Sequence, residues 1–202
     1  MSTTTTPVKA EAQPRIALIF IALMLTMFLA SLSQMVLSSA QPTIVGELNG
    51  VELLSWISAA YLLASTVTMP IYGKISDVFG RKPLIIIAIL LFVAGSVVGG
   101  LATDMEILIA GRAIQGLGGG GLMILSQAAI ADVVPARERG KYMGLLGAVF
   151  AVSSVAGPLL GGWFTDGPGW RWAFWMNLPL GVLALLAVIF YLHTPKAQAN
   201  RG

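Results

Sequence analysis

ILIAGRAIQGLGGGGLMILSQAAIA occupies positions 107–131, and its single charged side chain is Arg112. A helix that crosses the hydrocarbon core of a bilayer needs about 20 mostly apolar residues, and this stretch is long enough. Its glycines do not form a phosphate-binding loop, because no Lys-Ser or Lys-Thr pair follows them and no strand precedes them. The stretch therefore predicts a transmembrane helix with a permanent positive charge inside it.

The rest of the chain has the same apolar character. Of its 202 residues, 56% are hydrophobic and 10% are charged, and the mean hydropathy is +0.84, whereas a soluble domain has about 25% charged residues. The apolar runs are too long, and alternate too little, for the strands of a membrane barrel. We therefore predict an all-α membrane protein with six transmembrane helices, at about 16–40, 54–72, 84–101, 107–131, 142–164 and 173–192.

Polar segments flank this bundle, which extends over 16–192. Residues 1–15 are predicted to form a disordered cytoplasmic tail, and residues 193–202 a second cytoplasmic tail or the start of a linker. The first apolar run is longer than the core of a signal peptide, which has about 7–15 residues, so we expect it to be retained.

The basic residues predict the orientation of the bundle. Lys and Arg gather in the cytoplasmic loops of membrane proteins. With the N-terminus inside, only Arg171 lies in an outer loop, and the cytoplasmic set is Lys9, Arg15, Lys74, Arg81, Lys82, Arg137, Arg139, Lys141, Lys196 and Arg201. The positive net charge is thereby explained without nucleic acid. We expect a multi-pass plasma membrane protein, specifically of a bacterial inner membrane, with both termini cytoplasmic.

The first helix carries a polar face. Ser31, Gln34, Ser38 and Gln41 follow at spacings that place them on one side of a helix. Polar residues in such positions join neighbouring membrane helices by hydrogen bonds, or they line a water-filled cavity. Both interpretations stay open for these four candidates, and they are compatible.

Arg112 has two possible orientations. Its head could reach the outer interface, because the residue lies about 8 Å along the helix from the start of the span. However, that end is the N-terminus of the helix, where the dipole disfavours a cation. Glycines permit close helix contacts, and the residues that share the face of Arg112 are Gln115, Gly116, Gly119, Gly120 and Met123. We therefore expect Arg112 and Gln115 to point into the bundle.

Two further stretches combine glycine with less common residues. GKISDVFGRKP, at 73–83, is a predicted cytoplasmic loop in which Asp77 lies among basic residues. An acid there can contact a helix N-terminus or a basic partner. AGPLLGG, at 156–162, lies inside the fifth span, where Pro158 removes a backbone hydrogen bond. This pattern is typical of a tightly packed, kinked helix.

These stretches together resemble a known family. GKISDVFGRK is similar to the G-x-x-x-D-x-x-G-[RK]-[RK] loop signature of the major facilitator superfamily, and RAIQG is similar to its R-x-x-Q-G signature in helix four. AGPLLGG resembles its G-P-x-x-G-G antiporter signature, and WRWAFWMNLPLG resembles a segment common in the fourteen-span drug:proton antiporter branch. The resemblance covers about 28–192 and implies the N-terminal six-helix half of that fold, built from two inverted three-helix repeats.

The resemblance also implies roles for the matched residues. A conformational latch would comprise Gly73, Asp77, Gly80, Arg81 and Lys82. A polar centre linked to proton coupling would comprise Arg112 and Gln115. A bendable helix between two halves of the transporter would comprise Gly157, Pro158, Gly161 and Gly162.

Two features depart from that branch. Ser33 occupies a position that often carries an acid, and all nine acidic residues lie at or beyond the ends of the spans. Because proton relays in transporters commonly use membrane-embedded carboxylates, proton coupling lacks its usual group here. The branch also has a second set of helices, so the expected partner is a missing C-terminal half or a second copy of this chain.

The predicted function is secondary active transport, specifically proton-coupled multidrug efflux by alternating access, with this chain as the N-terminal half. Its partners would be small amphipathic molecules, protons and the bilayer, and no cofactor or metal is expected. No constellation of catalytic residues supports an enzyme. The alternative is a truncated, transport-inactive membrane bundle, or an assembly partner for another half-transporter.

Overall fold

The computed structural model describes residues 12–192, whose regular secondary structure is helical throughout. The elements are α1 (Ala12–Leu48), η1 (Val51–Leu53), α2 (Leu54–Phe79), α3 (Arg81–Gly100), α4 (Met105–Val133), α5 (Arg139–Asp166), α6 (Trp172–Trp175) and α7 (Asn177–Tyr191). Six segments of this part of the chain are long and apolar enough to cross a membrane, and α6 and α7 together form the last. The prediction of an all-α bundle with six transmembrane helices is confirmed.

Several helices extend beyond the apolar runs that predicted them. α1 starts at Ala12, inside the expected tail, and continues through Pro42 to Leu48. α2 continues to Phe79, so the prediction of a loop over 73–83 was wrong for most of that stretch. Hydropathy marks only the part of a helix that lies in hydrocarbon, whereas helical hydrogen bonding continues into water until a residue breaks it. Residues 1–11 and 193–202, which hold the rest of both predicted tails, lie outside the described part of the chain.

The break between α2 and α3 falls at Gly80. Its φ of +95° lies in the region that favours glycine, and its N–H donates to the carbonyl of Ser76 at 2.9 Å. Gly73, in contrast, lies within α2, where its carbonyl accepts a hydrogen bond from the Ser76 hydroxyl at 2.9 Å. The interruption between the two helices is therefore confined to one residue.

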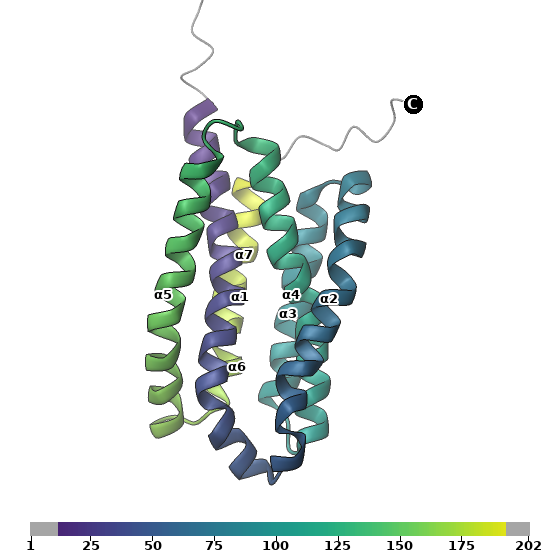
Figure 1. Cartoon of the computed structure of the whole chain (residues 1–202), viewed down its shortest axis with the longest axis vertical. Helices are drawn as coiled ribbons and strands as arrows, with labels where there is room; N and C mark the ends of the chain where they lie inside the picture. The colour runs from purple at the N-terminus through teal and green to yellow at the C-terminus, as the bar shows by residue number, and fades with distance from the viewer. Residues whose placement is uncertain (1–11, 193–202) are drawn as a thin grey trace, which may run out of the picture.

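The six spans form two groups of three. α1 packs along α5 and α7, and α4 packs along α2 and α3, while contacts of α1 with α4 and of α3 with α7 join the groups (Figure 1). The same pattern of helix contacts results when each helix of the first half is replaced by its counterpart in the second. In this correspondence, α1 matches α4, α2 matches α5, and α3 matches the α6–α7 pair. Because α1 and α4 start at opposite ends of the bundle, this is the arrangement expected of two inverted three-helix repeats.

Glycines allow α4 to approach its neighbours closely. A β-carbon at Gly116 would lie 2.5 Å from the carbonyl oxygen of Tyr61 on α2. A β-carbon at Gly111 would lie 2.7 Å from the backbone nitrogen of Gly99 on α3. A larger residue at either position would force a backbone to move, so the predicted glycine contact face is present on α4.

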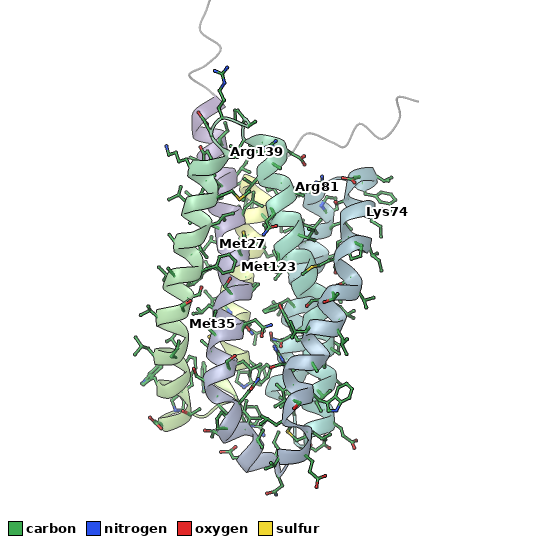
Figure 2. The ribbon with its side chains drawn as sticks, viewed as in Figure 1. Met27, Met35, Lys74, Arg81, Met123 and Arg139 are labelled. Carbon is green, nitrogen blue, oxygen red and sulfur yellow. The ribbon has the colours of Figure 1, made fainter. Side chains whose placement is uncertain are left out.

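The basic side chains lie where the orientation rule expects them. Lys74, Arg81 and Arg139 are found at the end of the bundle at which α1 begins (Figure 2). This is the end that the Lys and Arg distribution assigns to the cytoplasm. The arrangement supports the predicted orientation, which stays a prediction.

Candidate functional site

Arg112 lies inside the bundle, with only 2% of its surface exposed. Its Nε donates to the carbonyl of Ile57 at 3.0 Å, Nη1 donates to Oε1 of Gln115 at 2.9 Å, and Nη2 donates to Oε1 of Gln34 at 2.7 Å. The guanidinium carbon also lies 4.5 Å from the centre of the Tyr61 ring. Arg112 therefore points into the bundle, as the glycine face predicted, and does not reach the outer interface.

The charge of Arg112 is stabilised by neutral groups. The two ion pairs of the described residues both involve Arg81, and no carboxylate among the described residues contacts Arg112. A buried cation is costly unless hydrogen bonds and polarisable groups replace its hydration. Three carbonyl or amide oxygens and one aromatic face serve this purpose here.

The hydrogen bonds continue from Arg112 across the centre of the bundle. Nε2 of Gln115 donates to the Ser96 hydroxyl at 2.7 Å. Nδ2 of Asn177 donates to the hydroxyls of Ser96 at 2.9 Å and Ser33 at 3.0 Å. These contacts join α1, α3, α4 and α7 into one polar network around the predicted centre formed by Arg112 and Gln115.

Sequence reasoning missed two members of this network. Ser96 is an isolated serine in an apolar helix and gave no signal. Asn177 is part of the segment WRWAFWMNLPLG, which the resemblance included, but no role was predicted for it. Ser33, the position that departs from the antiporter pattern, is 2% exposed and faces α7.

A cavity of about 200 Å³ lies beside the network. It is lined by residues of α1, α2, α4 and α5, namely Ala30, Ser31, Gln34, Met35, Tyr61, Met123 and Phe150. Met35 and Met123 lie in the middle of the molecule (Figure 2). Because Gln34 also binds Arg112, one side chain connects the cavity with the buried charge.

The predicted polar face of the first helix is divided between two places. Ser31 and Gln34 line the cavity, and the hydroxyl of Ser31 is buried without a hydrogen-bond partner among the described residues. Ser38 is exposed. Gln41 donates to the Ser58 hydroxyl of α2 at 3.0 Å. Gln34 combines an interhelical hydrogen bond with a place in the cavity wall, so both interpretations of this face stay open.

Two of the four residues in the predicted bendable helix pack against α1. A β-carbon at Gly161 would lie 2.6 Å from the β-carbon of Ser39, and one at Gly157 would overlap Met35. Pro158 is exposed, and nothing lies within 4 Å of a β-carbon built on Gly162. In this part of the motif, glycine is needed for contact with α1 at Gly157 and Gly161 only.

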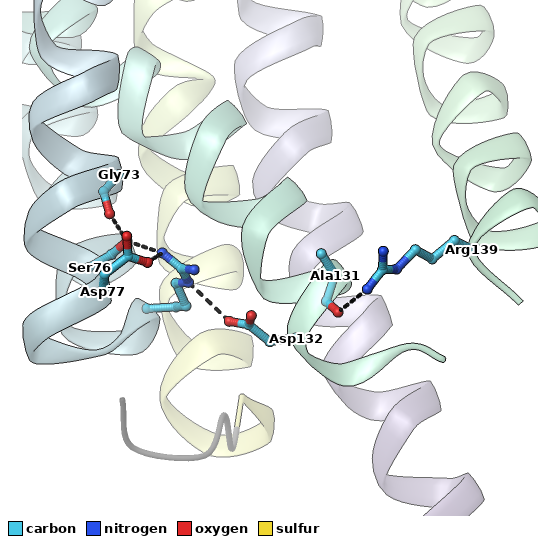
Figure 3. A network of polar contacts seen from close by, with 7 residues as sticks. Gly73, Ser76, Asp77, Ala131, Asp132 and Arg139 are labelled. Atoms are coloured by element: carbon cyan, nitrogen blue, oxygen red, sulfur yellow. Dashed lines mark hydrogen bonds and ion pairs between the residues drawn. The ribbon is translucent and has the colours of Figure 1, made fainter. Parts of the chain in front are cut away.

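Residues of the predicted latch form a polar cluster at the connection between α2 and α3 (Figure 3). Arg81 pairs with Asp77 at 2.9 Å and with Asp132 at 3.0 Å, and it also donates to the hydroxyl of Ser76. Lys82 points elsewhere, donating to the carbonyl of Ile189 on α7 at 2.8 Å. Asp132, which sequence reasoning did not single out, extends the latch from α2 and α3 to α4.

A basic residue of α5 reaches the same end of α4. Arg139 donates to the carbonyl of Ala131 at 3.1 Å, next to Asp132 in the chain (Figure 3). The last turn of α4 is therefore held by polar contacts to α3 and α5. Movement of α4 at this end would have to break these two polar contacts.

The sequence matches the family model described as the Major Facilitator Superfamily over residues 23–202. The chain belongs to the Major Facilitator Superfamily. This confirms the resemblance drawn from the motifs and places the chain with transporters rather than enzymes.

Its relatives in the superfamily include proteins named as pumps. The chain is 42% identical over 186 residues to the MFS-type efflux pump LUC4 of Fusarium sp, which covers 92% of this chain and 33% of that protein. It is 45% identical over 168 residues to an uncharacterized MFS-type transporter of Mycobacterium tuberculosis, which covers 83% of this chain and 24% of that protein. The chain thus spans about a third or less of the length of these curated relatives.

Solved structures show the same fold. The superfamily chain is similar to a D-xylose-proton symporter with a TM-score of 0.78 and 19% sequence identity, over 89% of this chain and 49% of that chain. An inward-open xylose transporter from E. coli gives a TM-score of 0.77 at 20% identity. The six helices therefore correspond to one half of a major facilitator fold.

Proposed function

We propose that this superfamily member acts as one half of a secondary active efflux transporter, exporting small amphipathic molecules by alternating access coupled to proton antiport. The observation that carries the proposal is the mostly apolar cavity that abuts the buried Arg112 network. Relatives named as efflux pumps support the direction of transport.

The cavity suits part of an amphipathic molecule. Its walls are mainly apolar side chains, among them Met35, Met123 and Phe150, with a few polar groups between them. Small-molecule sites have this character and commonly measure about 300–1,000 Å³. A volume of about 200 Å³ fits a site that another half completes, as expected near the midplane of such transporters.

The latch fits a role in conformational cycling. The side chain of Asp77 is 66% exposed and that of Asp132 is 39% exposed, and ion pairs at such positions contribute little stability individually. They can therefore break and re-form during transport. The close glycine contacts of α4 and α5 keep the half itself rigid while it moves against its partner.

Proton coupling requires a group that this half does not supply within its described spans. Arg112 keeps its charge at physiological pH because guanidinium does not deprotonate. We infer that the carboxylate that carries the proton belongs to the partner half, either a C-terminal half or a second copy. The charge of Arg112 would then favour deprotonation of that carboxylate when the two approach.

The proposed location is the plasma membrane, with both termini cytoplasmic. The matched relatives include fungal and mycobacterial proteins, so the bacterial inner membrane stays a prediction. The alternative function, a transport-inactive bundle or assembly partner, predicts the same helices and the same latch.

An efflux experiment separates the two functions. Inverted membrane vesicles from cells expressing the natural reading frame would be given an acidic lumen, and accumulation of a fluorescent amphipathic dye would be followed. The transporter predicts accumulation that a protonophore abolishes, compared with vesicles lacking the protein. Dye movement that is the same with and without the protein would favour the inactive bundle.

A further inference from the structure

Gln34 is the side chain at which the cavity meets the buried charge. Its Oε1 accepts a hydrogen bond from Nη2 of Arg112 at 2.7 Å, and the same side chain lines the cavity. A guanidinium group has only donors. The amide oxygen therefore faces Arg112, and the amide nitrogen, with its two N–H donors, is the end of the group that remains for other partners.

The other polar groups of the cavity add to this donor character. Ser31 is 6% exposed and lines the cavity, and its buried hydroxyl has no hydrogen-bond partner among the described residues. Tyr61 supplies a phenol whose ring lies against the guanidinium. None of the seven lining residues is acidic. The polar groups beside the cavity are thus hydroxyl and amide groups, and none of them is a carboxylate.

Arg112 adds a positive potential behind this surface. It lies behind Gln34, is almost fully buried, and has no carboxylate partner in the described chain. In a medium of low dielectric constant, an unneutralised charge is felt strongly over a few ångströms. A cation in the cavity is therefore disfavoured, and an oxygen that carries negative or partial negative charge is favoured.

We propose that this cavity selects amphipathic molecules that present a carbonyl or carboxylate oxygen, and that Gln34 is the residue that determines this preference over organic cations. The inference rests on the proposed function, because it names the chemical class of the exported molecule. The apolar walls would hold the body of the molecule, and the Gln34 amide and Ser31 hydroxyl would donate to its oxygen.

Binding of three matched probes tests the proposal. The probes are 2-naphthylacetate, 2-naphthylacetamide and a 2-naphthylmethyl-trimethylammonium ion, titrated into the full natural-length protein in nanodiscs of neutral lipid, with empty nanodiscs as blank. We expect the carboxylate and the amide to bind at least about tenfold more tightly than the ammonium ion, the difference that one charge-sensitive hydrogen bond makes.

The variant Gln34→Glu should reverse this order. A carboxylate at position 34 would pair with Arg112, remove the donors and add an acceptor, so the ammonium probe should gain and the carboxylate probe should lose about tenfold in affinity. Asn49→Asp is the matched control, since it makes the same amide-to-acid change at an exposed outer turn. It should keep the wild-type order.

The proposal is overturned if the wild-type protein binds the ammonium ion as tightly as the carboxylate, or binds none of the probes. The wild-type order tests it even if Gln34→Glu fails to fold. A folded Gln34→Glu protein that keeps the wild-type order also overturns it. Gradient-driven export without the predicted order would refute this inference alone, whereas the predicted order without export would refute the transport function alone.

Discussion

Asn177 on α7 and Ser96 on α3 are joined by a 2.9 Å hydrogen bond, and the same serine hydroxyl accepts a second hydrogen bond from Gln115 on α4. The amide of Asn177 also reaches Ser33 on α1. One asparagine therefore connects the two groups of helices at the level of the buried arginine, and its loss should be felt in the stability of the whole bundle.

We expect Asn177→Leu to lower the free energy of unfolding by about 1–3 kcal/mol, because two interhelical hydrogen bonds are lost, each contributing about 0.6–1.7 kcal/mol in membrane proteins. Equilibrium unfolding in mixed detergent micelles measures this change. Ser154→Ala is the control, because that hydroxyl bonds only within α5, to Phe150. Equal stability of Asn177→Leu and the wild type would contradict the role of the network.

Arg112→Lys should reduce export although it keeps the charge. Lysine offers a compact ammonium group in place of a planar fork, and it cannot serve acceptors on Ile57, Gln34 and Gln115 from three different helices. We expect the initial efflux rate, normalised to protein in the membrane, to fall by about tenfold or more, equivalent to about 1.4 kcal/mol. The control Arg137→Lys changes an exposed residue. A wild-type rate in Arg112→Lys would argue against a role for the fork.

Asp77→Asn should impair conformational cycling more than insertion or folding. The ion pair with Arg81 is largely exposed on the Asp77 side, so its loss should cost less than about 1 kcal/mol of stability. We expect a clearly lower transport rate at unchanged expression. Asp132→Asn removes the other partner of Arg81 and should behave alike. Full transport in both single variants and in the double variant would show that the cluster is not a latch.

Gly157→Ala and Gly162→Ala form a matched pair on α5. The first places a methyl group against Met35, whereas the second places it in open space. We expect Gly157→Ala to destabilise the bundle by about 1–3 kcal/mol, the usual cost of overpacking, and Gly162→Ala to leave thermal unfolding in detergent nearly unchanged. If the two variants melted alike, the assignment of Gly157 to the α1 contact would be wrong.

Sequence reasoning succeeded where the signal was local. The apolar length of 107–131 predicted a membrane helix, and the glycines around Arg112 predicted its inward direction. It predicted a loop where α2 continues to Phe79, since hydropathy does not report where a helix stops in water. It overlooked Asp132, whose partner Arg81 lies 51 positions away in the chain.

The isolated polar residues show why the site could not be predicted in full. Ser96 lies in an apolar helix. The sequence around it would be the same whether its side chain faced lipid, a cavity or another helix. Only the rotation of α3 against α4 and α7 brings its hydroxyl to Gln115 and Asn177. The closure of the network is a property of four helices, and no local pattern in any one of them contains it.

By itself, the sequence determined six membrane helices, because a chain in lipid can satisfy its backbone groups within such helices and the apolar runs are long enough to cross. The tertiary structure decided which polar side chains meet. Ser33 and Gln34 are neighbours in α1, yet Ser33 accepts a hydrogen bond from Asn177 and Gln34 accepts one from Arg112. Consecutive residues of a helix point about 100° apart, so the packing of α1 against α4 and α7 assigns each to a different partner.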